Sequence, residues 1–521
     1  MTDGILDALS KWEDRGQQRT EARYFFSSPD LASDIEGLMA GQKCFVLGSK
    51  GAGKTAVLHH IKSIANERDL FLENRFSPKN LKDFCTQTAN DTVRGADLDL
   101  LWTYLICAKV CLKVADERLG AWRRFDLGAK YGLSSQRSWW QRMWRHRPRV
   151  RRLKVDAANG GFEFEATPNP GVTFQAVEAP VEQHQEGLTF PAPRDKRTGD
   201  FLWGTHSEFA ISDAIAAVRA AQTRIFVFFD EIDVPFSQAR DQQTFDEYLA
   251  TVGALISSVH GLRTAFDQAD VPIYPIVAIR NDIYSYVSHA DKGALDGRAV
   301  EIRYEQEDDL QPLIAHRLNA ALGKPPTGSP ADFEKVWRKA VNETRSIADR
   351  ESMYMQIRRR TLNRPRDYVK YLKLAAQAQR RLRPPRKLIS QQAVGLAASE
   401  FSSFFIQEFK DEISFRYPFA DWLLDVFRRV CPRPENNRFQ FHDFEVACVD
   451  RGIKGDRGYL VDLAKHLFLI SVFGRQTRSG GTFEPAQFRY RDQRLAFPSS
   501  LDDPNTFFCL HSGFLRALHE N

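Results

Sequence analysis

A glycine-rich octapeptide between an apolar run and a helical pattern is the feature that most constrains the fold of this chain. Residues 48–55 read GSKGAGKT and directly follow the apolar run 43–47, which reads KCFVL. A short apolar run that ends at a glycine is typical of a buried strand. Residues 55–65 then carry a helical pattern. The sequence therefore predicts a strand, a tight glycine turn and a helix in direct succession, which is the start of a parallel βαβ arrangement.

The octapeptide fits the P-loop pattern GxxxxGK[ST] at every fixed position. In such a loop the backbone N–H groups point at phosphate oxygens, and the following helix N-terminus adds a partial positive charge. We expect Lys54 to bridge the β- and γ-phosphates of ATP and the Thr55 hydroxyl to ligate Mg²⁺. The alternative is a glycine turn that binds no nucleotide. The residues expected to bind the cofactor are Gly48, Ser49, Lys50, Gly51, Ala52, Gly53, Lys54, Thr55 and Ala56.

A second motif lies about 175 residues further along, where residues 225–231 read IFVFFDE. A central strand of a parallel sheet is apolar throughout, and ligands bind beyond its carboxyl end. We expect Asp230 to hold the Mg²⁺ shell and Glu231 to act as the general base that polarises the attacking water. Asp233 is a further candidate. The alternative is a solvated acidic turn after a strand.

A third apolar run ends in polar residues at 276–282, which read IVAIRND. The carboxyl ends of parallel strands face the same crevice. Arg280 or Asn281 is therefore expected to contact the γ-phosphate or the attacking water. A helix N-cap formed by Asn281 or Asp282 is the alternative.

The chain has 521 residues, which is too long for one hydrophobic core. Alternating strand and helix patterns continue through residue 304 and predict an α/β fold with a three-layer parallel sheet. A basic and β-rich stretch at about 125–205 is expected to be an insertion on that core. The predicted divisions are an N-terminal helical strap (1–40), the core (41–304), a helical lid (305–390) and a winged-helix-like domain (391–521).

Together these motifs resemble those of the AAA+ and STAND P-loop ATPases, particularly the prokaryotic ones that end in a winged helix. The resemblance covers most of the chain except the insertion. It implies that Arg280 or Asn281 senses the γ-phosphate and that Arg298, before the last core strand, reaches the site of a neighbouring subunit as a catalytic residue. The segment 363–367, NRPRD, is similar to the second sensor motif, with Arg364 or Arg366 as the sensor.

Two further matches concern the adenine and the lid. Residues 24–26, YFF, lie where such proteins pack the adenine, and residues 305–318 are similar to the first lid helix. The chain also departs from the family pattern. Asn281 is flanked by charges, and the insertion before the second motif is unusually long.

The resemblance implies a switch or motor ATPase that forms a homo-oligomer and regulates a partner effector protein in prokaryotic anti-phage defence. One alternative is a DNA-binding AAA+ enzyme that remodels or loads DNA complexes. Another is a scaffold that binds ATP without turnover. The sequence shows no nuclease, protease or deaminase constellation, so an effector activity is expected to belong to the partner.

Charge distribution bears on the partners. The formal net charge is +6, and residues 137–154 hold eight Lys or Arg, three Trp and no acid. Such a stretch is expected to bind DNA or another nucleic acid through charge and stacking, to form a protein interface, or to serve as an internal strut. Residues 358–387 are also basic, with Asp367 the only acid, and a solvated lid face is the main alternative there.

The lengths of the apolar stretches and the positions of the cysteines bear on the cellular compartment. No apolar stretch approaches the roughly 20 residues that cross a bilayer, and the first residues do not resemble a secretory signal. We expect a cytoplasmic protein without membrane association. Cys107 and Cys111 lie four residues apart in an apolar helical stretch, which favours core packing over a metal site.

Overall fold

The computed structural model describes residues 3–12, 25–75, 95–131, 152–165, 187–191, 203–232, 242–287, 295–342 and 352–519, with shorter gaps inside several of these ranges. The chain divides into two units. The sheet unit comprises Leu31–Leu47 and Val57–Glu301, and the helical unit comprises Met1–Asp30, Gly48–Ala56 and Ile302–Asn521.

Five apolar runs of the sheet unit form one parallel sheet in the order β2-β6-β7-β1-β8. The strands are β1 (Phe45–Gly48), β2 (Leu70–Arg75), β6 (Ile225–Asp230), β7 (Ile273–Arg280) and β8 (Ala299–Ile302). Strands β1 and β6 are buried along their length except for Asp230, because helices cover both faces of the sheet. The strands predicted from the apolar runs are confirmed, with ends that shift by one or two residues.

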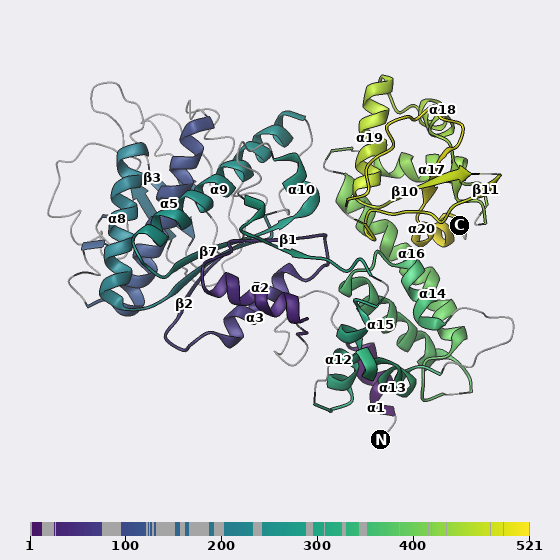
Figure 1. Ribbon diagram of the computed structural model, residues 1–521, viewed down its shortest axis with the longest axis horizontal. Helices are drawn as coiled ribbons and strands as arrows, with labels where there is room; N and C mark the ends of the chain where they lie inside the picture. The colour runs from purple at the N-terminus through teal and green to yellow at the C-terminus, as the bar shows by residue number, and fades with distance from the viewer. Residues whose placement is uncertain are drawn as a thin grey trace. The chain divides into compact units, whose positions relative to one another are not determined.

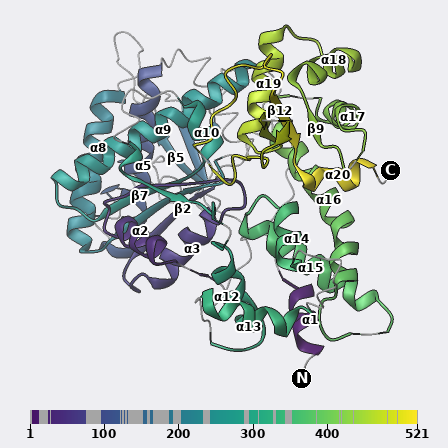
Figure 2. The same ribbon diagram turned by 45° about the vertical axis from the view of Figure 1, so that its right-hand side comes forward.

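Two layers of helices cover the sheet, as Figures 1 and 2 both show: α5, α8 and α9 lie on one face and α2 and α3 on the other. Their bounds are α2 (Pro29–Met39), α3 (Lys54–Ile64), α5 (Gly95–Arg118), α8 (Trp203–Ala221), α9 (Gln242–Gln268) and the short α10 (Asn281–Tyr286). Cys107 and Cys111 are fully buried in α5, so the core-packing prediction is confirmed. The three-layer α/β prediction is confirmed at this level.

The insertion contains a small antiparallel sheet in the order β4-β3-β5. Its strands are β3 (Arg152–Asp156), β4 (Phe162–Glu165) and β5 (Gly187–Pro191). The short strands expected after the basic stretch are therefore present. Most of the basic stretch 137–154 lies outside the described residues.

The helical unit begins with α1 and continues after β8 with four helices. Together, these five helices are α1 (Asp3–Ser10), α12 (Gln311–Ala321), α13 (Pro330–Ala340), α14 (Met353–Arg360) and α15 (Pro365–Arg381). Ile5, Leu6 and Leu9 of α1 join the same buried apolar cluster as the inner faces of α12 to α15. Pro365 starts α15, where its missing N–H has no intrahelical partner to lose.

The C-terminal elements follow the long helix α16 (Gln391–Ile413). They are α17 (Ala420–Val430), β9 (Arg438–Phe439), α18 (Phe441–Arg451), α19 (Arg457–Leu469), β10 (Phe473–Ser479), β11 (Thr482–Phe483), β12 (Thr506–Leu510) and α20 (Ser512–His519). The four strands pair antiparallel in the order β11-β10-β12-β9. The Ser402 hydroxyl of α16 donates to the Gly513 carbonyl at 2.6 Å and accepts from the Ala517 amide at 3.0 Å, which joins α16 to α20.

Within the described residues, no helix combines the length and the apolar character needed to span a membrane.

Candidate functional site

The glycine-rich loop, residues 48–55, connects the end of β1 to the start of α3. Gly51 and Gly53 have φ angles of +83° and +110°, in the left-handed region that glycine adopts without a Cβ penalty. A Cβ at Gly53 would meet no atom within 4 Å, so the backbone angle and not the space requires glycine there. Lys54 Nζ donates to the carbonyl oxygens of Gly48 at 3.0 Å and Ser49 at 3.1 Å. The lysine side chain is thus folded back along the loop that precedes it.

Two cations at the loop share one carboxylate. Lys50 Nζ lies 3.1 Å from Glu408 Oε2, and the Arg366 guanidinium pairs with the same oxygen. The Arg366 amide donates to the Gly51 carbonyl at 3.5 Å, and the Arg366 side chain lies over Gly51. All four residues belong to the helical unit. Of the two sensor arginines implied by the resemblance, Arg366 is therefore the one that the structure places against the loop.

Arg364 faces a different acid. Its Nη1 lies 3.9 Å from Glu412 Oε2, and both side chains are 7% exposed. The neighbouring Asp367 carboxylate accepts a hydrogen bond from the Leu362 amide at 3.1 Å. Burial raises the pKa of Asp367, and the two arginines oppose that rise. Arg364 therefore belongs to a buried charge cluster that holds the start of α15.

The second motif lies at the carboxyl end of β6. The Glu231 amide donates to Asp230 Oδ1 at 2.9 Å, and Glu231 has a φ of +57°, which is uncommon for a residue with a Cβ. The Tyr248 hydroxyl of α9 donates to the Ile232 carbonyl at 2.8 Å and so anchors the turn. Asp233 lies outside the described residues. The glycine-rich loop follows the carboxyl end of β1, and this second motif follows the carboxyl end of β6. Both strands belong to the same parallel sheet, with β7 between them.

The polar residues at the end of β7 do not form the helix N-cap that was the alternative for Asn281 or Asp282. Arg280 is the N-cap residue of α10, with no side-chain capping bond, and Asn281 and Asp282 are the first helical residues. Asp282 instead accepts from Arg280 Nε at 3.0 Å and Nη2 at 2.5 Å. The N-cap interpretation of Asn281 or Asp282 is wrong, because Arg280 holds the N-cap position and both residues already lie inside the helix. Arg280 is 4% exposed at its side chain.

Arg298 directly precedes β8, which is an edge strand of the sheet. Its carbonyl accepts from the amides of Cys44 at 2.9 Å and Phe45 at 3.2 Å, at the amino end of β1. Burial raises the pKa of the Cys44 thiol to about 12, and the nearby Arg298 guanidinium partly opposes that rise. Within its own chain Arg298 is therefore not at the carboxyl end of β1 or β6. Its predicted action on a neighbouring subunit stays a prediction.

One of the aromatic residues expected near the adenine has a defined neighbour. The Phe26 ring lies 5.8 Å from the His316 ring of α12, centroid to centroid. Tyr24 lies outside the described residues. The contact joins the segment before α2 to the first helix of the predicted lid.

A buried polar bridge near Asp230 was not foreseen from the sequence. Lys109 Nζ of α5 donates to Asn74 Oδ1 at 2.5 Å, and Asn74 Nδ2 donates to the Phe228 carbonyl at 3.2 Å. Lys109 and Asn74 are both buried, so the bridge links α5 to β2 and to β6, two residues before Asp230. The available signal was a lysine inside a largely apolar helical stretch. Glu408 was also missed, and no local pattern marks it.

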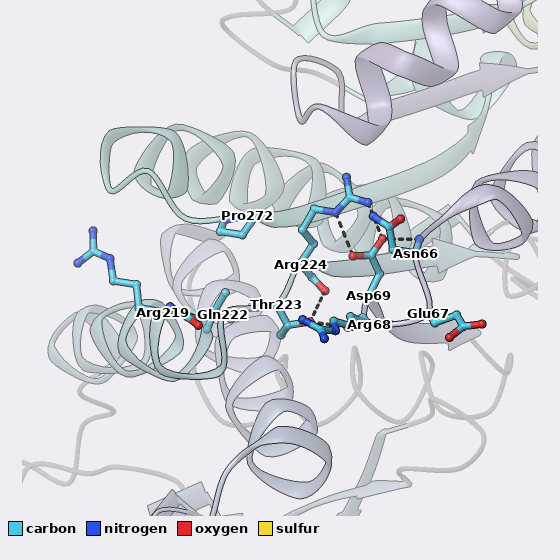
Figure 3. Close-up of a pocket in the computed structure, with 10 residues that line it drawn as sticks. Asn66, Glu67, Arg68, Asp69, Arg219, Gln222, Thr223, Arg224 and Pro272 are labelled. Atoms are coloured by element: carbon cyan, nitrogen blue, oxygen red, sulfur yellow. Dashed lines mark hydrogen bonds and ion pairs between the residues drawn. The ribbon is translucent and has the colours of Figure 1, made fainter.

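A polar pocket of about 590 Å³ opens at the amino ends of β2, β6 and β7. Figure 3 shows Arg224 turned toward Asp69, with Nε and Nη2 at 3.0 and 2.6 Å from the two carboxylate oxygens. The Thr223 hydroxyl donates to the Arg68 carbonyl at 2.6 Å. These groups satisfy each other, so they stabilise the turns that enter the strands. The pocket is at the amino ends of the strands, whereas the motifs follow the carboxyl ends.

Several cations of the basic stretch 358–387 are engaged within the chain. Arg380 pairs with Asp7 at 3.4 Å and Arg381 with Glu400 at 2.9 Å, and Lys370 lies 5.0 Å from the centre of the Phe404 ring. These contacts show that part of the stretch packs within the fold, and DNA binding by the stretch stays a prediction.

Comparison with known families identifies one match. Residues 308–410 match the model of the FunZ-associated C-terminal helical domain, which corresponds here to α12, α13, α14, α15 and most of α16. Arg364, Arg366 and Glu408 lie inside the matched region, and the glycine-rich loop lies outside it. No curated protein matches the chain.

Proposed function

We propose that this chain is an ATP-binding and ATP-hydrolysing P-loop ATPase of the AAA+/STAND type. The observation that carries the proposal is the form of the glycine-rich loop. It has left-handed glycines at 51 and 53 and a lysine folded along its carbonyls, and it follows a strand of the parallel sheet that also holds β6. Loops of this form, between a strand and a helix N-terminus, bind phosphate groups.

The roles in catalysis follow from residue chemistry. Lys54 and Arg366 would neutralise phosphate charge, and Glu231 would polarise the attacking water. Thr55 and Asp230 offer a hydroxyl and a carboxylate oxygen, which is the donor chemistry that Mg²⁺ prefers. The bound ion would supply charge stabilisation at the phosphate oxygens. Arg280 would lie at the end of β7, where its ion pair with Asp282 fixes the orientation of the guanidinium.

The remaining parts fit a switch or motor. Helices α12 to α15 would form the lid. The elements α17-β9-α18-α19-β10-β12, with β9 and β10 flanking β12, would form the winged-helix-like domain. Family resemblance supports a homo-oligomer that regulates a partner effector in prokaryotic anti-phage defence. Loss of protection from phage in cells that carry a Lys54→Ala variant would test that context.

Release of inorganic phosphate from Mg-ATP tests the enzymatic claim. The account predicts multiple turnovers by the purified protein, without a requirement for DNA. A rate that depends on added duplex DNA would support the DNA-remodelling alternative. Stoichiometric ATP binding without phosphate release would support the scaffold and contradict the proposal.

A further inference from the structure

Glu408 occupies an unusual position for an acidic residue beside a glycine-rich loop. It lies on α16, and its Oε2 atom is shared by Lys50 of the loop and Arg366 of α15. Burial alone would raise the pKa of Glu408, but Arg366, Lys50 and Arg364 outweigh burial and lower it. The side chain is 16% exposed, so a carboxylate is held among these cations with little water.

Of these cations, Arg366 is the one that the proposed function assigns to phosphate, and Lys50 lies in the loop that would bind it. Arginine and lysine pair with carboxylate and phosphate oxygens through the same charge-assisted hydrogen bonds. Two anions held against the same cations repel each other. A phosphate chain on the loop therefore competes with the Glu408 carboxylate for Lys50 and Arg366.

We propose that Glu408 is an internal counter-ion that holds the loop in its nucleotide-free state and is displaced when phosphate binds. The inference rests on the proposed function, and it adds a regulatory contact to the site. Displacement would release α16 from the loop while the Arg364–Glu412 contact, one helical turn further along, keeps α16 on the lid.

Helix α16 is well placed to transmit that release. Ser402 bonds to Gly513 and to Ala517 of α20, and Phe409 packs edge-on against Phe514 at a centroid distance of 5.3 Å. These contacts lie on the same helix as Glu408 and join it to the C-terminal elements. A change of partner at Glu408 is therefore transmitted to α20 by packed side chains.

The test compares the parent protein with Glu408→Gln, which keeps the shape and removes the charge. Isothermal titration with Mg-ADP, Mg-ATP and inorganic pyrophosphate should show affinity on the order of tenfold higher in the variant, because the competing anion is gone. Glu408→Asp should retain the parent affinity more closely. Glu400→Gln is the matched control on α16, since Glu400 pairs with Arg381 at 2.9 Å, and it should leave affinity unchanged.

The outcomes separate this inference from the proposed function. Equal or weaker affinity in a folded Glu408→Gln variant, while the parent binds ATP, overturns the counter-ion role and leaves the ATPase proposal standing. Nucleotide binding by Glu408→Gln but not by the parent supports the counter-ion role, because the carboxylate then blocks the site completely. Absence of binding in both, with unchanged melting temperatures, overturns both ideas. Hydrogen exchange gives a second readout: ADP should accelerate exchange around Glu408 in the parent and not in the Gln variant.

Discussion

The backbone amide of Glu231 donates to Asp230 Oδ1 at 2.9 Å, at a turn where Glu231 adopts a left-handed φ of +57°. The two neighbouring carboxylates are thus carried by different backbone conformations, one at the end of a strand and one in a strained turn. A strained backbone persists only where surrounding contacts impose it, and such residues gather at functional sites. This local geometry suits the separate roles that we propose, with Asp230 as a metal ligand and Glu231 as the base.

Lys54→Ala is expected to remove most nucleotide affinity. The change removes the ammonium group that donates to the Gly48 and Ser49 carbonyls of the loop. It thereby removes the positive charge expected to bind the β- and γ-phosphates. Isothermal titration with Mg-ATP measures the effect. Lys62→Ala, on the same helix and paired with Glu73 at 2.6 Å, is the control that should bind normally. Equal affinities in the two variants would remove Lys54 from the site.

Gly51→Ala should destabilise the loop. An alanine would take the left-handed φ of +83° at a cost of about 1–2 kcal/mol, and its Cβ would lie 3.2 Å from Arg366 Cβ. Gly395→Ala is the contrasting change, because Gly395 lies inside α16 with open space around it. It should stabilise the protein by about 0.5–1 kcal/mol. Chemical denaturation of both variants checks the signs, and stabilisation by Gly51→Ala would contradict the described loop.

Acid should destabilise the helical unit through His511. Burial, aided by Arg491 and Arg364, lowers the pKa of His511 from its ordinary value of 6.5 to about 3. The unfolded state therefore binds the extra proton first, and stability is lost as pH falls from 6.5 toward 3. The slope is at most about 1.4 kcal/mol per pH unit. Urea unfolding of His511→Gln at several pH values should show a weaker acid dependence than the parent, whereas parallel curves would exclude this role.

Arg298 is expected to act on a neighbouring subunit. In its own chain it lies at the amino end of β1, beside Cys44, and not at the carboxyl ends where the motifs are. Mixing inactive Arg298→Ala and Glu231→Gln proteins should therefore restore part of the ATPase rate at hybrid interfaces. A protein that stays monomeric with ATP at every concentration, yet hydrolyses it, would rule out the shared site.

The parallel sheet could be predicted because its strands are continuous apolar runs that end in polar residues. Residues 225–230 are an example, since burial on both faces requires apolar side chains at every position. The loop could be predicted because glycines at 51 and 53 are needed for positive φ angles. The apolar run and the glycine spacing each lie within a few consecutive residues, so both can be recognised without knowledge of the tertiary packing.

The partner of the loop could not be predicted. Glu408 is one acid among many on amphipathic helices, and only the tertiary packing of α16 brings it to Lys50. The cap considered as the alternative at the end of β7 is wrong for a related reason. Asp282 suits an N-cap by residue type, but the preceding Arg280 pairs with it across two residues, and that choice depends on burial of the guanidinium.

Glu231→Gln tests the central claim most directly, because it separates ATP binding from hydrolysis. The amide keeps the size of the side chain and loses the base that polarises water. Phosphate release and Mg-ATP titration should be measured on the same preparations of parent and variant. The account predicts nearly unchanged affinity with turnover reduced on the order of 10²-fold or more. Hydrolysis by the variant at the parent rate would contradict it.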